Sequence, residues 1–439
     1  MTVELAHPST EPLASRSPTG ATQPRWAFLW TTPGRILTIG IILATLGVAS
    51  AFATSTTINE RQQALTTVLD HTEPLSFAAG QLYTKLSVAD AAAATAFIAG
   101  AEPRPVRQRY EQSITDAAVA LTRASSGLTD EPMQELLGRI SANLAVYTGL
   151  IETARTNNRA GNPVGSSYLA EASALMQETI LPDAQLLYKE TSSRVETETT
   201  ASTRIPAPVI LVLATTIVFG LFAHRWLARR TRRRVNIGLI AGGLAIMVMV
   251  VWVGTALAVS TATSRRAQDT SADSLKTITN LAITAQQARA DETLSLIRRG
   301  DETVRKQSYY QRIDTMQQQL SAYLDSNRSP ERAALGDAET LLSKWRAADE
   351  RINAYISVGN YQAATQVALG TGEDDSTPAF DKLEEALDEG IRASRDQLRS
   401  DILNARRMLS GTTVGGVVLS LSAALAVALG LWPRMSEYR

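Results

Sequence analysis

Four long apolar runs constrain this chain more than any other feature of its sequence. They cover residues 36–54, 205–223, 237–260 and 412–432, and none contains Asp, Glu, Lys, Arg or His. Each reaches the ~20 residues that an α-helix needs to cross the hydrocarbon core of a bilayer. The sequence therefore predicts an integral membrane protein with four transmembrane helices.

The first run has a second interpretation. Ala51, Phe52 and Ala53 fit the small-x-small pattern of a signal-peptidase site. However, a hydrophilic segment of 35 residues precedes the run, and its apolar stretch exceeds the ~7–15 residues usual for a signal peptide. We expect a retained span, and cleavage stays open as the alternative.

Arginines predict the orientation of the spans. Six of the eleven residues in HRWLARRTRRR (224–234) are Arg and none is acidic. Because basic loops stay in the cytoplasm, the loop 224–236 should lie on the cytoplasmic side of the plasma membrane. The tail 1–35 and the tail 433–439 then also lie in the cytoplasm, and the tail 1–35, rich in Pro, Ser, Thr and Gly, should be disordered.

The two remaining segments, 55–204 and 261–411, are nearly equal in length and should be extracytoplasmic. They share ordered local similarities: Ala89-Asp90 with Ala290-Asp291, Gly100 with Gly300, and RQRYEQSI (107–114) with KQSYYQRI (306–313). Equal, similar segments indicate an internal duplication. The alternative is that two helical segments rich in Ala, Leu and Gln look alike by composition.

Helical periodicity runs through both segments. Apolar or small residues alternate at spacings of four and three, which predicts packed helices and an all-α fold, at Leu75, Ala79, Leu82, Leu86, Ala89 and Ala93, and again at Ile313, Met316, Leu320 and Tyr323. We call such a row of packed residues on one helix face a seam. A further seam is predicted in the first segment at Leu137, Ile140, Leu144, Tyr147 and Ile151, and in the second segment at Leu341, Trp345, Ala348, Ile352 and Tyr355. Breaks rich in Gly, Pro, Asn or Asp fall at 100–105, 125–132, 157–167, around 300, at 326–331, and at 359 and 370–378. Each segment is thus predicted to form an antiparallel four-helix bundle whose first and last helices run straight into the spans.

A search for reaction chemistry gives a negative result. Cys is absent, and the three His residues are scattered. His71 could join Asp70 and Glu73 at a metal, and the acidic loop Glu373-Asp374-Asp375 could hold a cation, but solvated positions are the simpler interpretation of both. No phosphate-binding glycine loop, GxSxG or HExxH motif is present, so we expect no enzyme, cofactor or metal.

Glycine pairs in the spans indicate close helix packing. Gly238 and Gly242, and likewise Gly411 and Gly415, have the spacing that lets two transmembrane helices approach each other. Packing within one chain and a specific dimer contact are both consistent with them. The cytoplasmic parts are too short to form a catalytic domain, so we expect any output to pass through a separate partner.

The order span, helical bundle, span resembles the sensor module of bacterial chemoreceptors and sensor kinases, here present twice. In outline the chain resembles the GlnX family of actinobacterial four-span membrane proteins. The four spans, the paired helical segments and the basic loop carry that resemblance, which covers nearly the whole chain.

The resemblance implies a signal transducer. A periplasmic glutamate- and aspartate-binding lipoprotein (GlnH in that family) would dock on the bundles, and a cytoplasmic Ser/Thr protein kinase (PknG) or an adaptor would sense the change. The candidate inner contacts, with a partner or with anionic membrane lipids, are Arg225, Arg229, Arg230, Arg232, Arg233 and Arg234. The alternatives are a direct small-molecule sensor that uses its own bundles, and a non-catalytic envelope scaffold or accessory membrane subunit.

Overall fold

The computed structural model describes residues 32–99, 104–128, 130–203, 207–231, 237–297, 302–326 and 331–436. These residues form helices joined by short turns, and they contain no strand. The all-α prediction is therefore confirmed for the described part of the chain. The chain consists of two compact units.

The first unit consists of the chain up to Ala53, Pro208–Val250, and the chain from Gly416 onward. It contains portions of α1 (Thr32–Thr67), α7 (Ala207–Thr231), α8 (Ile237–Arg266) and α15 (Thr412–Ser436). Within the described residues, four helices are long and apolar enough to cross a membrane. The prediction of four transmembrane helices is thereby confirmed.

Large apolar side chains point outward on these helices. Examples are Phe52, Leu211, Leu221, Val414 and Leu429, each more than half exposed. Water would penalise such a surface, whereas lipid tails solvate it. The exposure pattern therefore agrees with helices surrounded by lipid.

Small and polar residues mediate the packing of the spans. Gly242 lies against Val427 and the Ala423 carbonyl, close enough that a Cβ at this position would lie 2.8 Å from Val427 Cγ2. The hydroxyls of Ser50 and Thr216 are hydrogen-bonded at 2.9 Å between α1 and α7. Gly242 thus serves packing within this chain, as one of the two interpretations of its motif predicts.

The second unit consists of Thr54–Ala207 and Val251–Gly415 and holds two helical bundles. Bundle 1 is built from the end of α1, the π-helical segment η2 (Val68–Thr72), α2 (Glu73–Ile98), α3 (Arg104–Gly127), α4 (Glu131–Arg159), α5 (Gly165–Leu175), the π-helical segment η3 (Met176–Ile180) and α6 (Leu181–Thr203). These pieces make four rods, since α1–η2–α2 and α5–η3–α6 are each uninterrupted.

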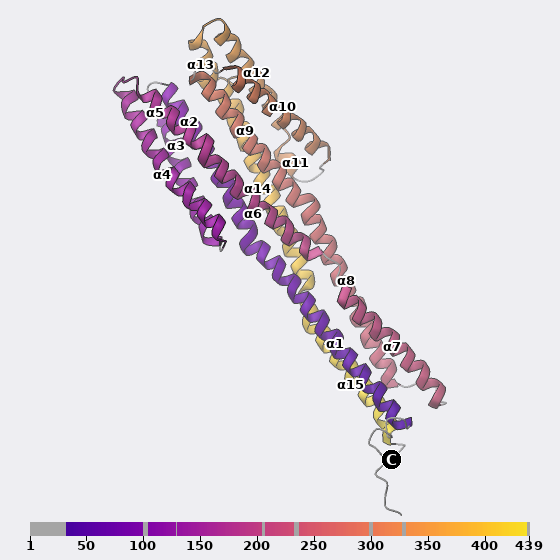
Figure 1. Cartoon of the computed structure of the whole chain (residues 1–439). Coiled ribbons are helices and arrows are strands. Elements are labelled where there is room, and N and C mark those ends of the chain that lie inside the picture. The colour runs from indigo at the N-terminus through magenta and orange to yellow at the C-terminus, as the bar shows by residue number, and fades with distance from the viewer. Residues whose placement is uncertain are drawn as a thin grey trace, which may run out of the picture. The chain divides into compact units, whose positions relative to one another are not determined.

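Bundle 2 repeats the plan with two additional short helices. It contains the end of α8, the π-helical segment η4 (Ala267–Ala272), α9 (Asp273–Ile297), α10 (Glu302–Ser326), α11 (Glu331–Ala334), α12 (Ala338–Ser357), α13 (Tyr361–Leu369) and α14 (Ser376–Leu409). Figure 1 shows the two sets of helices in their different colours. The short α11 begins at the end of the predicted break 326–331, and α13 lies between the predicted breaks at 359 and 370–378.

The predicted seams lie in the cores. All six seam residues of α2, from Leu75 to Ala93, are buried, and so are Ile313, Met316, Leu320 and Tyr323 of α10. On α12 the prediction is wrong at both ends: Leu341 is only partly buried and Tyr355 is exposed. Leu342 and Ile356 are buried instead. At both of its ends, the buried face of α12 is shifted by one residue from the face that the comparison with bundle 1 predicts.

Glycine marks one unpredicted interruption. Gly411 has φ of +81° between the end of α14 at Leu409 and the start of α15 at Thr412. This left-handed conformation suits glycine and ends a helix. The prediction that the last helix of bundle 2 runs straight into the fourth span is therefore wrong.

The two bundles share side chains across their contact. α2 packs against α9, so that Ile283 of α9 belongs to the apolar core of bundle 1. In the reverse direction, Phe77 of α2 packs against the core of bundle 2. Because each core is completed by the other bundle, the two bundles form a single compact unit rather than two separate domains.

Candidate functional site

The contact between the bundles contains a buried carboxylate. Glu73, the first residue of α2, has a side chain that is only 2% exposed. Its Oε1 accepts a hydrogen bond from Arg395 Nε, and its Oε2 accepts one from Arg399 Nη1 at 2.7 Å. Both arginines lie on α14 of bundle 2, and Arg395 also stacks 3.9 Å over the ring of Phe77. A carboxylate of bundle 1 is thus neutralised by bundle 2.

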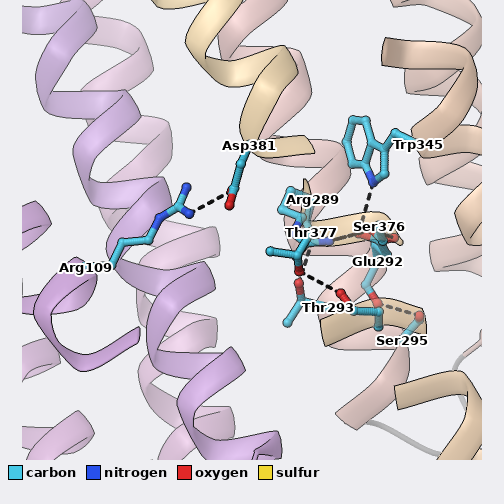
Figure 2. Close-up of polar contacts among 10 residues, drawn as sticks. Arg109, Arg289, Glu292, Thr293, Ser295, Trp345, Ser376, Thr377 and Asp381 are labelled. Atoms are coloured by element: carbon cyan, nitrogen blue, oxygen red, sulfur yellow. Dashed lines mark hydrogen bonds and ion pairs between the residues drawn. The ribbon is translucent and has the colours of Figure 1, made fainter. Parts of the chain in front are cut away.

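A second set of charges joins the bundles through α3 and α14. Arg109 donates through Nη1 to Asp381 Oδ1 at 2.7 Å, and through Nη2 to Glu384 Oε2 at 2.6 Å. Figure 2 shows the Arg109 side chain reaching toward Asp381. Gln286 donates to the other oxygen of Glu384 at 2.8 Å. Burial raises the pKa of Glu384, and Arg109 opposes this shift.

Bundle 2 encloses a polar network of its own. Arg289 contacts Glu292, and it donates to Ser376 Oγ and Thr377 Oγ1 at 2.8 Å each. Trp345 Nε1 donates to Glu292 at 3.2 Å, as Figure 2 shows. Because the Arg289–Glu292 pair is buried, removing one partner would leave an uncompensated charge in the core. The network therefore fixes the relative positions of α9, α12 and α14.

Asp349 lies near this network. Burial, followed by the charge of Glu292, raises its pKa to about 7. It accepts a hydrogen bond from Asn353 at 2.7 Å. Bundle 2 thus holds a carboxyl group that titrates near neutral pH.

Bundle 1 has a carboxylate in a different environment. Asp90 is buried and accepts hydrogen bonds from Tyr147, Ser173 and Gln177 at 3.3, 3.2 and 2.8 Å. Burial raises its pKa to about 6, and the three hydrogen bonds oppose that shift. These three partners are neutral, in contrast to the arginines that hold Glu73.

Two π-helical segments lie at equivalent places in the bundles. η2 and η4 each precede the helix that packs across the contact, namely α2 and α9. Thr72, at the end of η2, donates to Glu198 on α6, and Ser271 in η4 donates to Asp401 on α14 at 2.8 Å. Such segments are rare and often mark functional sites. A side-chain hydroxyl therefore links η2 to the last helix of bundle 1, and another links η4 to the last helix of bundle 2.

A cavity of about 350 Å³ lies between the bundles. Its walls come from α2 and α6 of bundle 1 and from α9 and α14 of bundle 2. Most of the exposed wall area is apolar although many lining side chains are polar, and Glu196, Asp273 and Lys276 supply charge. Its volume lies at the lower end of the ~300–1,000 Å³ that small-molecule sites occupy.

The predicted arginine cluster is only partly described. Arg225 and Arg229 lie on α7 with exposed side chains, and Arg230 belongs to the same helix. Arg232, Arg233 and Arg234 lie outside the described residues. The structure thus extends the helix of the second span into the basic segment.

The residues considered as metal ligands lie in different surroundings. Asp70 and His71 are exposed on η2, whereas Glu73 is buried against the two arginines. In the acidic loop, Asp375 accepts from the Gly372 amide at 2.8 Å, and Glu373 contacts Lys344 at 3.3 Å. The described residues hold no group of three or more His, Asp or Glu that could bind a metal ion.

Sequence reasoning missed the residues that join the bundles. Glu73 was noted only as a neighbour of His71, and its partners Arg395 and Arg399 lie more than 320 positions away. Glu73 lies two positions before Leu75 and so falls off the predicted seam of α2, which means that no local signal marked it.

A family model described as an actinobacterial sensor domain matches residues 64–200. The match supports an actinobacterial sensor-type protein. The matched range begins near the end of α1 and ends within α6, so it spans bundle 1. Searches of curated proteins and of solved structures found no match. The family points to a role in sensing or signalling.

Proposed function

We propose that this sensor-type protein transmits a signal across the plasma membrane. In this proposal both bundles are extracytoplasmic, and both termini and the loop 224–236 are cytoplasmic. The four apolar helices, the match of residues 64–200 and the arginines of the loop support it.

The observation that carries the proposal is helical continuity. From Thr32 to Ile98, α1, η2 and α2 follow one another without interruption. That stretch includes a candidate span, residues inside the matched sensor range, and the helix that packs against bundle 2. A displacement of α2 against α9 therefore has an unbroken helix along which to reach the membrane.

We further propose that the signal is the supply of glutamate or aspartate. A ligand-loaded binding lipoprotein docks on the bundles, and a cytoplasmic Ser/Thr kinase or adaptor responds at the arginine loop. The resemblance in outline to four-span transducers supports this finer proposal.

The relay also sets an energetic requirement on the bundles. A docked partner shifts the equilibrium between two bundle conformations only as far as it binds one conformation better than the other. A tenfold preference supplies ~1.4 kcal/mol, so the two states must be nearly balanced.

Photo-crosslinking in the native membrane tests the relay. A photoreactive residue replaces exposed Val146 in bundle 1, exposed Val358 in bundle 2 or exposed Arg229 on α7, with and without external glutamate. We expect a bundle position to capture a periplasmic binding lipoprotein and position 229 to capture a kinase or its adaptor, each depending on glutamate. Capture of envelope-assembly proteins alone, unaffected by glutamate, would contradict the relay and favour a scaffold.

The cavity between the bundles favours a second function, direct sensing. A small molecule bound there would contact both bundles at once, because both supply its walls. Calorimetry on the purified full chain separates the two functions. Heat with a free small molecule favours direct sensing, whereas heat only with the loaded lipoprotein favours the relay.

A further inference from the structure

The cavity between the bundles has an apolar part of its wall. Phe77 and Gly80 of α2, Tyr188 of α6, Leu275 of α9, and Ile391 and Leu398 of α14 contribute to them. Gly80 lacks a side chain that would otherwise approach Tyr188 and Thr279 to within 3.4 Å. The walls therefore suit a small apolar group.

Opposite charges from the two bundles meet at the same cavity. Lys276 Nζ of α9 lies 3.3 Å from Glu196 Oε2 of α6, and their side chains are 51% and 58% exposed. An exposed pair of this kind contributes only ~0–1 kcal/mol, so separating its members costs little. The ammonium and the carboxylate are thus available to another charged partner.

The remaining acidic groups restrict what such a partner can be. Glu73 lines the cavity, but Arg395 and Arg399 already bind both of its oxygens. Asp273, exposed and one helical turn before Lys276, adds a second carboxylate beside Glu196. Lining carboxylates outnumber the single lysine, which disfavours an anion, while Lys276 disfavours a simple cation.

We propose that this cavity binds a small zwitterion with an apolar body, such as an amino acid with an apolar side chain. The ligand's ammonium binds Glu196 and its carboxylate binds Lys276, while the apolar side chain enters between α2, α9 and α14. Ligand charges thereby replace the direct pair and connect bundle 1 to bundle 2. This binding does not depend on the proposed lipoprotein relay, and either can fail without the other.

The position of the cavity gives the bound state a structural consequence. Glu73 directly follows η2, Ala272 ends η4, and both line the cavity. A ligand there contacts residues at the ends of both π-helical segments. Occupancy can therefore alter the two helices that lead from the first and third spans.

The test measures binding to the purified full chain in lipid nanodiscs by isothermal titration calorimetry. L-leucine and L-phenylalanine are the probes. Leucinamide, which lacks the carboxylate, 4-methylpentanoate, which lacks the ammonium, and glutamate, whose side chain is charged, are the comparators. We expect saturable binding of at least one probe, and at least tenfold weaker binding of all three comparators.

Variants locate the site. Lys276→Gln and Glu196→Gln should each weaken binding at least tenfold, and Ser76→Phe should block it by filling the cavity, since Ser76 lines it. Lys344→Gln is the matched control, because Lys344 forms a comparable exposed pair with Glu373 away from the cavity. All variants are first shown by circular dichroism to retain their helical content.

The proposal is overturned if the folded wild-type chain binds neither leucine nor phenylalanine. It is also overturned if leucinamide or glutamate binds as well as the probes, or if Lys276→Gln leaves the affinity unchanged. Because no lipoprotein or kinase is present, none of these outcomes bears on the relay.

Discussion

At the scale of single residues, buried carboxylates of this protein are held in two different ways. Glu73 and Glu292 are compensated by arginines, whereas Asp90 accepts hydrogen bonds from Tyr147, Ser173 and Gln177. The three neutral donors offset the effect of burial on the pKa of Asp90 only in part. Asp90 is therefore a residue where pH can act on bundle 1.

The stability of the protein should depend on pH through Asp90. Its pKa is about 6 in the folded state and near the ordinary 3.8 when unfolded. Between these values the folded state binds more protons, so the contribution of Asp90 to the unfolding free energy falls as pH rises and is constant above ~6. The difference corresponds to at most ~3 kcal/mol.

Thermal unfolding of wild type and Asp90→Asn at pH 4.5, 6 and 7.5 measures this effect. We expect wild type to lose stability relative to Asp90→Asn between pH 4.5 and 7.5. The nearby Tyr110 and Tyr147 stay protonated throughout, since burial raises the pKa of both. Asp325→Asn, at an exposed position, is the control. A constant difference between wild type and Asp90→Asn would contradict the prediction.

At the scale of helices, the π-helical segments are the elements that distinguish these rods from plain α-helices. A π turn interrupts the regular backbone hydrogen bonds of an α-helix, so the stability of the turn depends on other contacts. In η4 such a contact is the Ser271–Asp401 hydrogen bond, and Asp401 is buried and also accepts from Gln397 at 3.1 Å. Side-chain contacts thus support the irregular turn.

Ser271→Ala should loosen η4 locally. The variant removes a hydrogen bond to a charged acceptor, which typically contributes ~1.5–3 kcal/mol. We expect hydrogen–deuterium exchange of residues 267–272 to accelerate by roughly 10- to 100-fold, if opening is local. Thr284→Ala on α9, which removes only an exposed bond to the Asn280 carbonyl, should leave that exchange unchanged. Equal acceleration in both variants would refute a specific role for Ser271.

At the scale of the whole molecule, the output of the proposed relay depends on what the arginine segment can contact. The described part of the arginine segment continues α7, with Arg225 and Arg229 exposed. Arginine binds acidic protein surfaces and anionic lipid headgroups through its planar guanidinium. The segment can therefore act as a topology signal, a lipid contact or a partner contact.

Replacing Arg229, Arg230, Arg232, Arg233 and Arg234 by Gln separates these roles. If the segment binds the output partner, glutamate-dependent phosphorylation should be lost while insertion and topology stay intact. Accessibility labelling of single cysteines placed in the loop and in α4 measures topology, since the natural chain has no Cys. Arg25→Gln, in the N-terminal tail, is the control. Phosphorylation that survives with correct topology would contradict a partner contact.

Much of the fold was predictable because the spacing of apolar residues along a helix indicates which side chains are buried. The seam of α2 and that of α10 were identified from spacing alone, since small and apolar residues at spacings of three and four have few other arrangements. The register of α12 was missed because Trp345 and Ile352 fit two overlapping faces. Local spacing could not choose between Leu341 and Leu342.

The candidate site was far less predictable. The contacts of Glu73 with Arg395 and of Arg109 with Asp381 join residues more than 270 positions apart, and no local pattern marks them. The π-helical segments were also invisible, because their composition does not differ from that of α-helices. The cavity exists only once α2, α6, α9 and α14 are assembled.

The matching positions of η2 and η4 bear on the history of the chain. Adding one residue to an α-helix is a simple way to create a π turn, and the two segments lie about 200 positions apart, as do Gly100 and Gly300. Two separate gains at one position would be a coincidence, whereas a single gain that was later copied is the shorter history. Under the predicted duplication, the irregular turn would be older than the duplication, and an ancestor with one bundle would already have carried it.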